Sequence, residues 1–190
     1  MELPVRTAIG AVMTTSPATE STITPAAAEH RGVDYVWAVL RIALGWVFLW
    51  AFLDKTFGLG FATERDASWL NGGSPTEGFL SFGTKGPLAD FYQGMAGSAF
   101  ADWLFMIGLL GIGVALVLGI GMRIAAAAGA LLLVLMWSAA LWPENNPFMD
   151  DHLVYAGLLI GLAMTRAGDT LGLGKAWAAT GIVARNPWLK

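Results

Sequence analysis

Three stretches of this sequence are apolar and almost free of charge over the length that a membrane crossing requires. They run from about 35 to 53, from 103 to 121 and from 124 to 142, and Arg41 is the only charged residue inside them. A helix needs about 20 mostly apolar residues to cross the hydrocarbon core of a bilayer. A fourth apolar run reaches that length, at about 147–167, if its helix begins at Pro147 with Asn146 as its cap. The sequence therefore predicts an all-α, integral membrane four-helix bundle.

The composition agrees with this prediction and excludes several functions. Of the 190 residues, 56% are hydrophobic and 13% are charged, whereas about 25% are charged in an ordinary soluble domain. The net charge of -3 argues against a nucleic-acid partner, because nucleic-acid-binding domains are basic. The chain has no cysteine, which excludes disulfides, thiol catalysis and cysteine-held metal centres.

The basic residues predict how the chain is oriented. With four antiparallel spans, one end of the bundle carries seven basic residues and the other end carries three. The first set is Arg6, Arg31, Arg123, Arg166, Lys175, Arg185 and Lys190, and the second is Lys55, Arg65 and Lys85. Because basic residues collect on the cytoplasmic side, we expect both termini in the cytoplasm.

The domain boundaries follow from these spans. Residues 1–33 are small and polar, which favours a flexible cytoplasmic tail, with a helical anchor as the alternative. Residues 34–170 form the transmembrane domain. Residues 171–190 carry tryptophans and basic side chains, so we expect an interfacial segment along the inner leaflet.

The connection between the first two spans, residues 54–102, is too long to be a simple link. It is rich in aromatic residues, glycine and proline, and helix starts are predicted at Ser74 and Pro87. We therefore expect an extracytoplasmic, partly helical cap. It would either seal the outer mouth of the bundle or act as a lid over a ligand pocket, and these two roles are compatible.

The strongest polar cluster joins the third and fourth spans on the same outer side. It contains Glu144, Asp150, Asp151 and His152, with Tyr155 one turn further along. Carboxylate, imidazole and phenol groups at a membrane interface suit proton exchange with a quinone. The alternative is a capped helix start whose histidine only hydrogen-bonds an acid. The spacing matches no recognised metal site, so we predict none.

Arg41 is the other unusual polar residue, because a charge inside a span is costly unless it is paired. We expect an ion pair with Asp34 or Asp169. The alternative is a lipid headgroup or a quinone carbonyl as its partner.

Small residues recur every four positions in two of the spans. The two sets are Gly111, Ala115 and Gly119, and Gly157 and Gly161. Such spacing favours close packing of helix backbones in lipid.

Several of these motifs resemble one family of small membrane proteins. They are the end of the first span (45–55), the segment from Trp69 to Thr76, the glycine-rich second span and the start of the fourth at 146–152. Over about residues 34–170 the chain resembles the DoxX/DoxD family. The segment from Trp69 to Thr76 is more similar to the DoxD branch, the membrane subunit of thiosulfate:quinone oxidoreductase.

The resemblance implies a prokaryotic plasma-membrane protein in which thiosulfate is oxidised to tetrathionate outside and electrons pass to quinone. It implies a second small subunit and polar groups at the outer mouth, carried here by Trp69, Asn71, Asp150, Asp151 and His152. Together with the residue patterns, it leads us to expect His152, Asp151 and Asp150 as catalytic groups. Trp69, Asn71, Tyr155 and Arg41 are then expected to bind the quinone.

A second function remains open from the sequence. The glycines and the aromatic cap would equally suit a non-catalytic subunit that docks onto a larger respiratory or other redox complex. A transporter is less favoured, because the chain has no internal repeat and no broken span.

Overall fold

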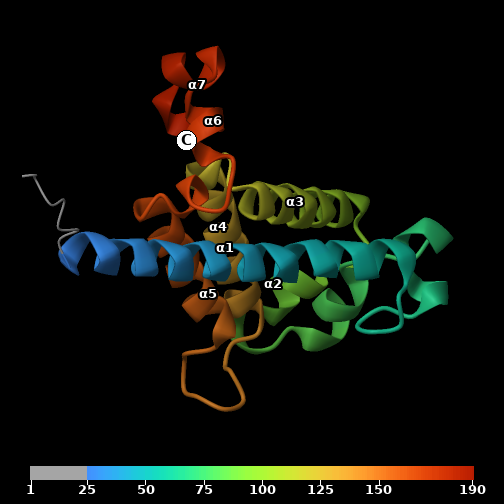
Figure 1. The fold of residues 1–190 in the computed structure, drawn as a ribbon. Coiled ribbons are helices and arrows are strands. Elements are labelled where there is room, and N and C mark those ends of the chain that lie inside the picture. Colours follow the sequence, from blue (N-terminus) through green and yellow to red (C-terminus); the bar gives the residue numbers. More distant parts are fainter. Residues whose placement is uncertain (1–24) are drawn as a thin grey trace, which may run out of the picture.

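The computed structural model describes the backbone of residues 25–190 and the side chains of residues 31–190. Within this range the protein is helical and contains no strand, as predicted (Figure 1). The four longest helices are α1 (Pro25–Phe57), α3 (Ala99–Leu118), α4 (Met122–Ala139) and α5 (Asp151–Met164). Of these, α1, α3 and α4 are long and apolar enough to cross a membrane. The chain is therefore a multi-pass membrane protein.

Two predicted boundaries need correction. Helix α1 begins at Pro25, so residues 25–33 are helical rather than part of a tail, and residues 1–24 lie outside the described range. The fourth helix has 14 residues and starts at Asp151, not near Pro147. The reason is local: the Asp150 carboxylate caps the helix by accepting from the Leu153 N–H. Asn146 instead accepts from the N–H groups of Phe148 and Met149, which folds a turn and not a helix start.

Helix α1 packs mainly against α3, α4 packs mainly against α5, and α3 joins the two pairs. The shared core contains Leu44, Phe48, Met106, Leu116 and Leu159, among other buried side chains. In Figure 1, α1 runs across the front of the view, and the short C-terminal helices stand out from the long ones.

The glycines that allow close packing are only partly those expected. An added Cβ on Gly113 would lie 2.8 Å from the Leu49 nitrogen of α1, and one on Gly45 would lie 2.8 Å from Leu116 Cβ. Gly111 and Gly157, by contrast, face open space and are exposed. The four-residue spacing is therefore misleading for Gly111 and Gly157, because it marks a face that the fold leaves uncovered.

The predicted second and third spans are separated by only residues 122–123, and the structure joins α3 and α4 by a tight hairpin. Gly119 ends α3 with a φ of 73°, and Gly121 precedes α4 with a φ of 58°. Glycine is favoured at both positions, because L-residues rarely adopt positive φ. The connection thus lies at 119–121, directly before Met122 and Arg123, which separate the two predicted spans.

Arg41 is fully buried and does not form the expected ion pair with Asp34 or Asp169. All five of its N–H groups instead donate to backbone carbonyls of the chain. The acceptors are the carbonyl oxygens of Leu116, Val117, Ala167, Thr170 and Leu171. The guanidinium therefore links α1 to the end of α3 and to the segment after α5, and it has no N–H left for a quinone.

The cap between α1 and α3 is partly helical, as expected. It contains short turns at Arg65–Ala67, Trp69–Asn71, Phe79–Gly83 and Gly86–Leu88, and the helix α2 (Ala89–Gln93). The predicted cap at Ser74 is present, since Ser74 Oγ accepts from the Glu77 N–H.

Hydrogen bonds fasten the cap to the ends of the long helices. The buried Asp102 carboxylate of α3 accepts from Ser74 Oγ, Thr76 N and Thr76 Oγ1 at 2.6–3.0 Å. Tyr92 Oη lies 2.6 Å from Ser138 Oγ of α4. These attachments hold the cap against the ends of α3 and α4.

The chain after α5 folds as a turn at Ala167–Asp169, the helices α6 (Gly174–Ala178) and α7 (Gly181–Arg185), and a last turn at Pro187–Leu189. Trp177 Nε1 donates to the Leu189 carbonyl at 2.7 Å, and the Arg123 N–H of α4 donates to the Lys190 carbonyl at 2.8 Å. This segment is thus folded onto the start of α4.

Candidate functional site

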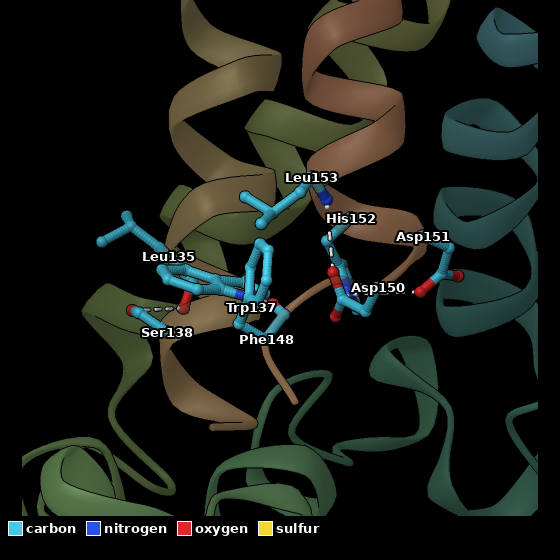
Figure 2. Close-up of polar contacts among 8 residues, drawn as sticks. All are labelled: Leu135, Trp137, Ser138, Phe148, Asp150, Asp151, His152 and Leu153. Carbon is cyan, nitrogen blue, oxygen red and sulfur yellow. Dashed lines mark hydrogen bonds and ion pairs between the residues drawn. The ribbon is translucent and has the colours of Figure 1, made fainter. Parts of the chain in front are cut away.

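The candidate site lies where the loop between α4 and α5 meets the first turn of α5. Trp137 of α4 holds this loop, because its Nε1 donates to the Phe148 carbonyl at 2.6 Å. The Asn146 turn then directs the chain into Asp150. An indole and an amide thus fix the approach to the acidic start of α5, and Figure 2 shows Trp137 against Phe148.

Asp150 connects the helix start to the histidine. One carboxylate oxygen accepts from the Leu153 N–H at 3.2 Å, and the other lies 2.8 Å from His152 Nδ1. Because a carboxylate accepts at Nδ1, that nitrogen carries a proton and Nε2 is left to exchange one. Asp151 Oδ1 is 3.5 Å from His152 Nδ1, and in Figure 2 a dashed line joins the Asp151 carboxylate to the pair.

The three side chains differ in exposure in a way that suits exchange with solvent. Side-chain exposure is 16% for Asp150 and 22% for His152, whereas it is 70% for Asp151. The Asp150–His152 pair is thus largely shielded from solvent, whereas the neighbouring carboxylate of Asp151 is exposed. This arrangement orients the imidazole by a hydrogen bond without removing it from contact with water.

A cavity of about 470 Å³ opens beside this cluster. Its walls are the loop after α4, the start of α5 and the cap, and they include Lys85, Trp142, Glu144, Met149 and Asp150. His152 lies behind Asp150, one hydrogen bond from the cavity wall. Trp142 and Met149 are exposed, so the wall combines apolar surface with carboxylates.

The charge at the cavity is negative. Lys85 forms an ion pair with Glu144 across the cavity mouth, and its hydrogen bond lowers the pKa of Glu144. Asp150 and Asp151 have no such cationic partner within residues 31–190, apart from His152 when it is protonated. The cavity therefore favours neutral or cationic ligands over anions.

The donor atoms of Asp150, Asp151 and His152 lie within 4.8 Å of one another. This spacing also fits a cation. Exposed acids often cluster in this way without an ion, and no further side chain in the described range completes a coordination shell, so we assign no metal.

The structure brings the three expected catalytic residues together, but not the four expected quinone ligands. Trp69 packs edge-on against Trp103 with ring centroids 4.6 Å apart, and Asn71 Nδ2 donates to the Arg65 carbonyl at 2.6 Å. Tyr155 packs against the helical core. None of these three lines the cavity.

Arg41 is excluded as a quinone ligand by a different observation, since all its N–H groups are bound to carbonyls. Those bonds place it beside the end of α3 and the segment after α5, whereas the Asp150–His152 pair lies at the start of α5.

The family model described as DoxX matches residues 36–142, which is more than half of the 190 residues. The chain belongs to the DoxX family. No curated protein and no solved structure matches this chain.

The match covers most of α1 and all of the cap, α3 and α4 of this DoxX protein, and it ends at Trp142. The Asp150–His152 pair and the whole of α5 follow that boundary. Membership in the DoxX family therefore supports the assignment of this chain as a membrane protein. The chemistry of the site follows from the geometry of its own residues, because they lie beyond the match.

Lys85, Trp142 and Met149 were not identified from the sequence, although they line the cavity. Lys85 lies in the cap, far from the polar cluster along the chain, and only the folding of the cap onto α4 brings it there through the Lys85 N–H bond to the Ala139 carbonyl. The signal available in the sequence was weak: Lys85 is one of only three basic residues on an otherwise acidic side.

Proposed function

We propose that this DoxX protein is a membrane subunit of a quinone-linked redox system, with its quinone site at the cavity beside Asp150 and His152. The observation that carries the proposal is the double hydrogen bonding of Asp150, to the helix start and to His152 Nδ1. A carboxylate that orients an imidazole is a common arrangement for proton transfer.

The cavity has the properties that a quinone would require. Its volume of about 470 Å³ falls in the range of small-molecule pockets, and Trp142 and Met149 offer an apolar surface for a lipid-soluble ring. A bound quinone would take up two electrons and two protons to become a quinol. Asp150, which lines the cavity, would pass the protons from His152 Nδ1 to the quinone, and His152 would be recharged from solvent at Nε2.

The source of the electrons is proposed to lie outside this cavity. Oxidation of two thiosulfate ions to one tetrathionate releases two electrons, which balances the reduction of one quinone. Glu144, Asp150 and Asp151 against Lys85 make the cavity unfavourable for a thiosulfate dianion. Thiosulfate oxidation therefore fits best on a second small subunit, and the assembly would lie in a prokaryotic plasma membrane with both termini of this chain in the cytoplasm.

The experiment compares His152→Gln with Asp66→Asn, which changes an exposed acid of the cap that makes no side-chain contact to the site. The full-length protein would be purified from its native membrane, and bound quinone would be measured by mass spectrometry. We expect about one quinone per chain in all three proteins. Quinone reduction by the native assembly should fall about 10²–10⁴-fold in His152→Gln, the range for loss of a general acid or base, and stay unchanged in Asp66→Asn.

Quinone reduction at the wild-type rate in His152→Gln would show that the Asp150–His152 pair has no catalytic role. Absence of quinone from the purified protein would remove the quinone site itself.

A docking subunit remains the second candidate, and the uncovered glycines favour it. Gly111 and Gly157 face open space on the outside of the helices, where another helix could approach closely. This alternative predicts that Gly157→Leu releases the chain from a larger complex while its own folding is preserved. Gly161 is not suited to this test, because its Cβ position already faces Trp37 at 3.4 Å.

A further inference from the structure

The basic end of the molecule contains a hollow that the redox proposal does not use. It lies between the start of α4, the end of α5 and the C-terminal segment, and has a volume of about 370 Å³. The C-terminal segment closes one side, because Arg123 binds it twice: its N–H donates to the Lys190 carbonyl and its Nη1 donates to the Pro187 carbonyl at 3.2 Å.

Three cationic side chains line this hollow. They are Arg123, Arg166 and Lys190, against one acid, Asp169. None of the three forms an ion pair with any residue from 31 to 190. Trp177 completes the wall, with its Nε1 bound to the Leu189 carbonyl. The cationic side chains in the lining of the hollow thus outnumber the acidic ones by three to one.

A second, apolar depression begins at the same arginine. It runs along α4 and is lined by Ile124, Ala127, Ala128 and Leu131, with Trp188 on one side. Its volume is about 490 Å³. The depression forms at Ala127 and Ala128 because their side chains are smaller than those of Ile124 and Leu131 on either side. Arg123 therefore stands where a cationic hollow and an apolar groove meet.

We infer that this end of the protein binds one anionic phospholipid of the bilayer. Arg123, Arg166 and Lys190 hold the headgroup phosphate through charge-assisted hydrogen bonds. One acyl chain lies in the groove of α4 against Ala128 and Trp188. A free phosphate would use only the hollow, whereas a lipid uses both features, and a zwitterionic headgroup would bring its amine against three cations.

The test uses the full-length protein in mild detergent and native mass spectrometry. Phosphatidylglycerol and phosphatidylcholine with the same acyl chains are added separately. We expect preferential retention of one phosphatidylglycerol per chain. Arg166→Gln should weaken that retention about fivefold, since each basic side chain near an anionic headgroup contributes about 1 kcal/mol. Lys175→Gln, an exposed basic residue of the same segment that lines neither feature, is the matched control and should bind as the wild type does.

Arg166 is suited to this test because its side chain makes no hydrogen bond to a described residue, so its loss leaves the fold intact. A second variant, Ala128→Trp, fills the groove and should also lower retention. Equal retention of the two lipids, or equal loss in Arg166→Gln and Lys175→Gln, would overturn the inference. Displacement of phosphatidylglycerol by millimolar inorganic phosphate would do so too, because it would show that the groove contributes nothing.

Discussion

Arg41 carries its charge in the middle of a spanning helix without a carboxylate partner. Its five N–H groups meet five backbone carbonyls. Two of these, from Leu116 and Val117, belong to the last turn of α3, where carbonyls lack partners inside the helix and the helix dipole is negative. Arg41 therefore serves as a cap for α3 that is supplied by α1.

We predict that Arg41→Leu strongly destabilises the protein. It leaves several buried carbonyls without a donor, and each buried acceptor left unsatisfied costs about 1–3 kcal/mol. Arg41→Lys keeps the charge but offers three donors for five carbonyls, so its loss should be intermediate. Unfolding by denaturing detergent, followed by circular dichroism, measures both. An unfolding midpoint in Arg41→Leu equal to that of the wild type would contradict this role.

The sequence identified Arg41 as unusual but not its partners. Hydropathy shows a charge inside a span, and an acid is the usual expectation for its partner. The true partners are carbonyls, which every residue has, so no residue type indicates them. Asp150 and His152 were predictable as a pair, because their contact is local and depends on the start of a single helix.

At the scale of helices, the close packing of α1 on α3 depends on one glycine from each helix, Gly45 of α1 and Gly113 of α3. A Cβ added to either glycine would lie within 3 Å of a backbone atom of the opposite helix. The sequence predicted small residues at helix contacts, but which face of α3 meets α1 is decided by the arrangement of all the helices. That is why Gly111 was selected wrongly.

We predict opposite effects for alanine at two neighbouring glycines of α3. Gly113→Ala should destabilise by about 1–3 kcal/mol, because the new Cβ would overlap the Leu49 backbone. Gly111→Ala has open space around it and should be neutral or stabilising by up to about 1 kcal/mol through helix propensity. Thermal unfolding of the two variants in the same detergent compares them directly. Equal midpoints would mean that α1 and α3 pack differently.

At the scale of the whole molecule, the two ends have opposite character. The cap and the Asp150–His152 pair lie at an acidic end, whereas the hollow with Arg123, Arg166 and Lys190 lies at a basic end. The composition of the spans was enough to predict α3 and α4 closely, whereas α1 begins at Pro25, well before its predicted span. The extent of α5 was not predictable in this way, because a side-chain cap at Asp150 competed with an equally plausible start at Pro147.

The orientation can be tested with single cysteines, since the natural chain has none. We predict that Phe148→Cys, in the exposed loop before α5, reacts with a membrane-impermeant maleimide on intact cells. Ala184→Cys, an exposed position of α7 that leaves the charge distribution unchanged, should react only after the membrane is permeabilised. The unmodified chain serves as the blank. Reaction of Ala184→Cys on intact cells would reverse the orientation given by the basic residues.

The length of α5 has a consequence for the bilayer around it. Its 14 residues extend about 21 Å, whereas the hydrocarbon layer is about 30 Å thick. The 20 residues of α3 match that thickness, so the mismatch is confined to one side of the molecule. For α5 to cross the bilayer, the lipids beside it would have to compress, which costs a fraction of a kcal/mol for each Å. Such compression would draw the headgroup region in toward His152, so that the thickness of the host membrane would control how much water reaches that imidazole.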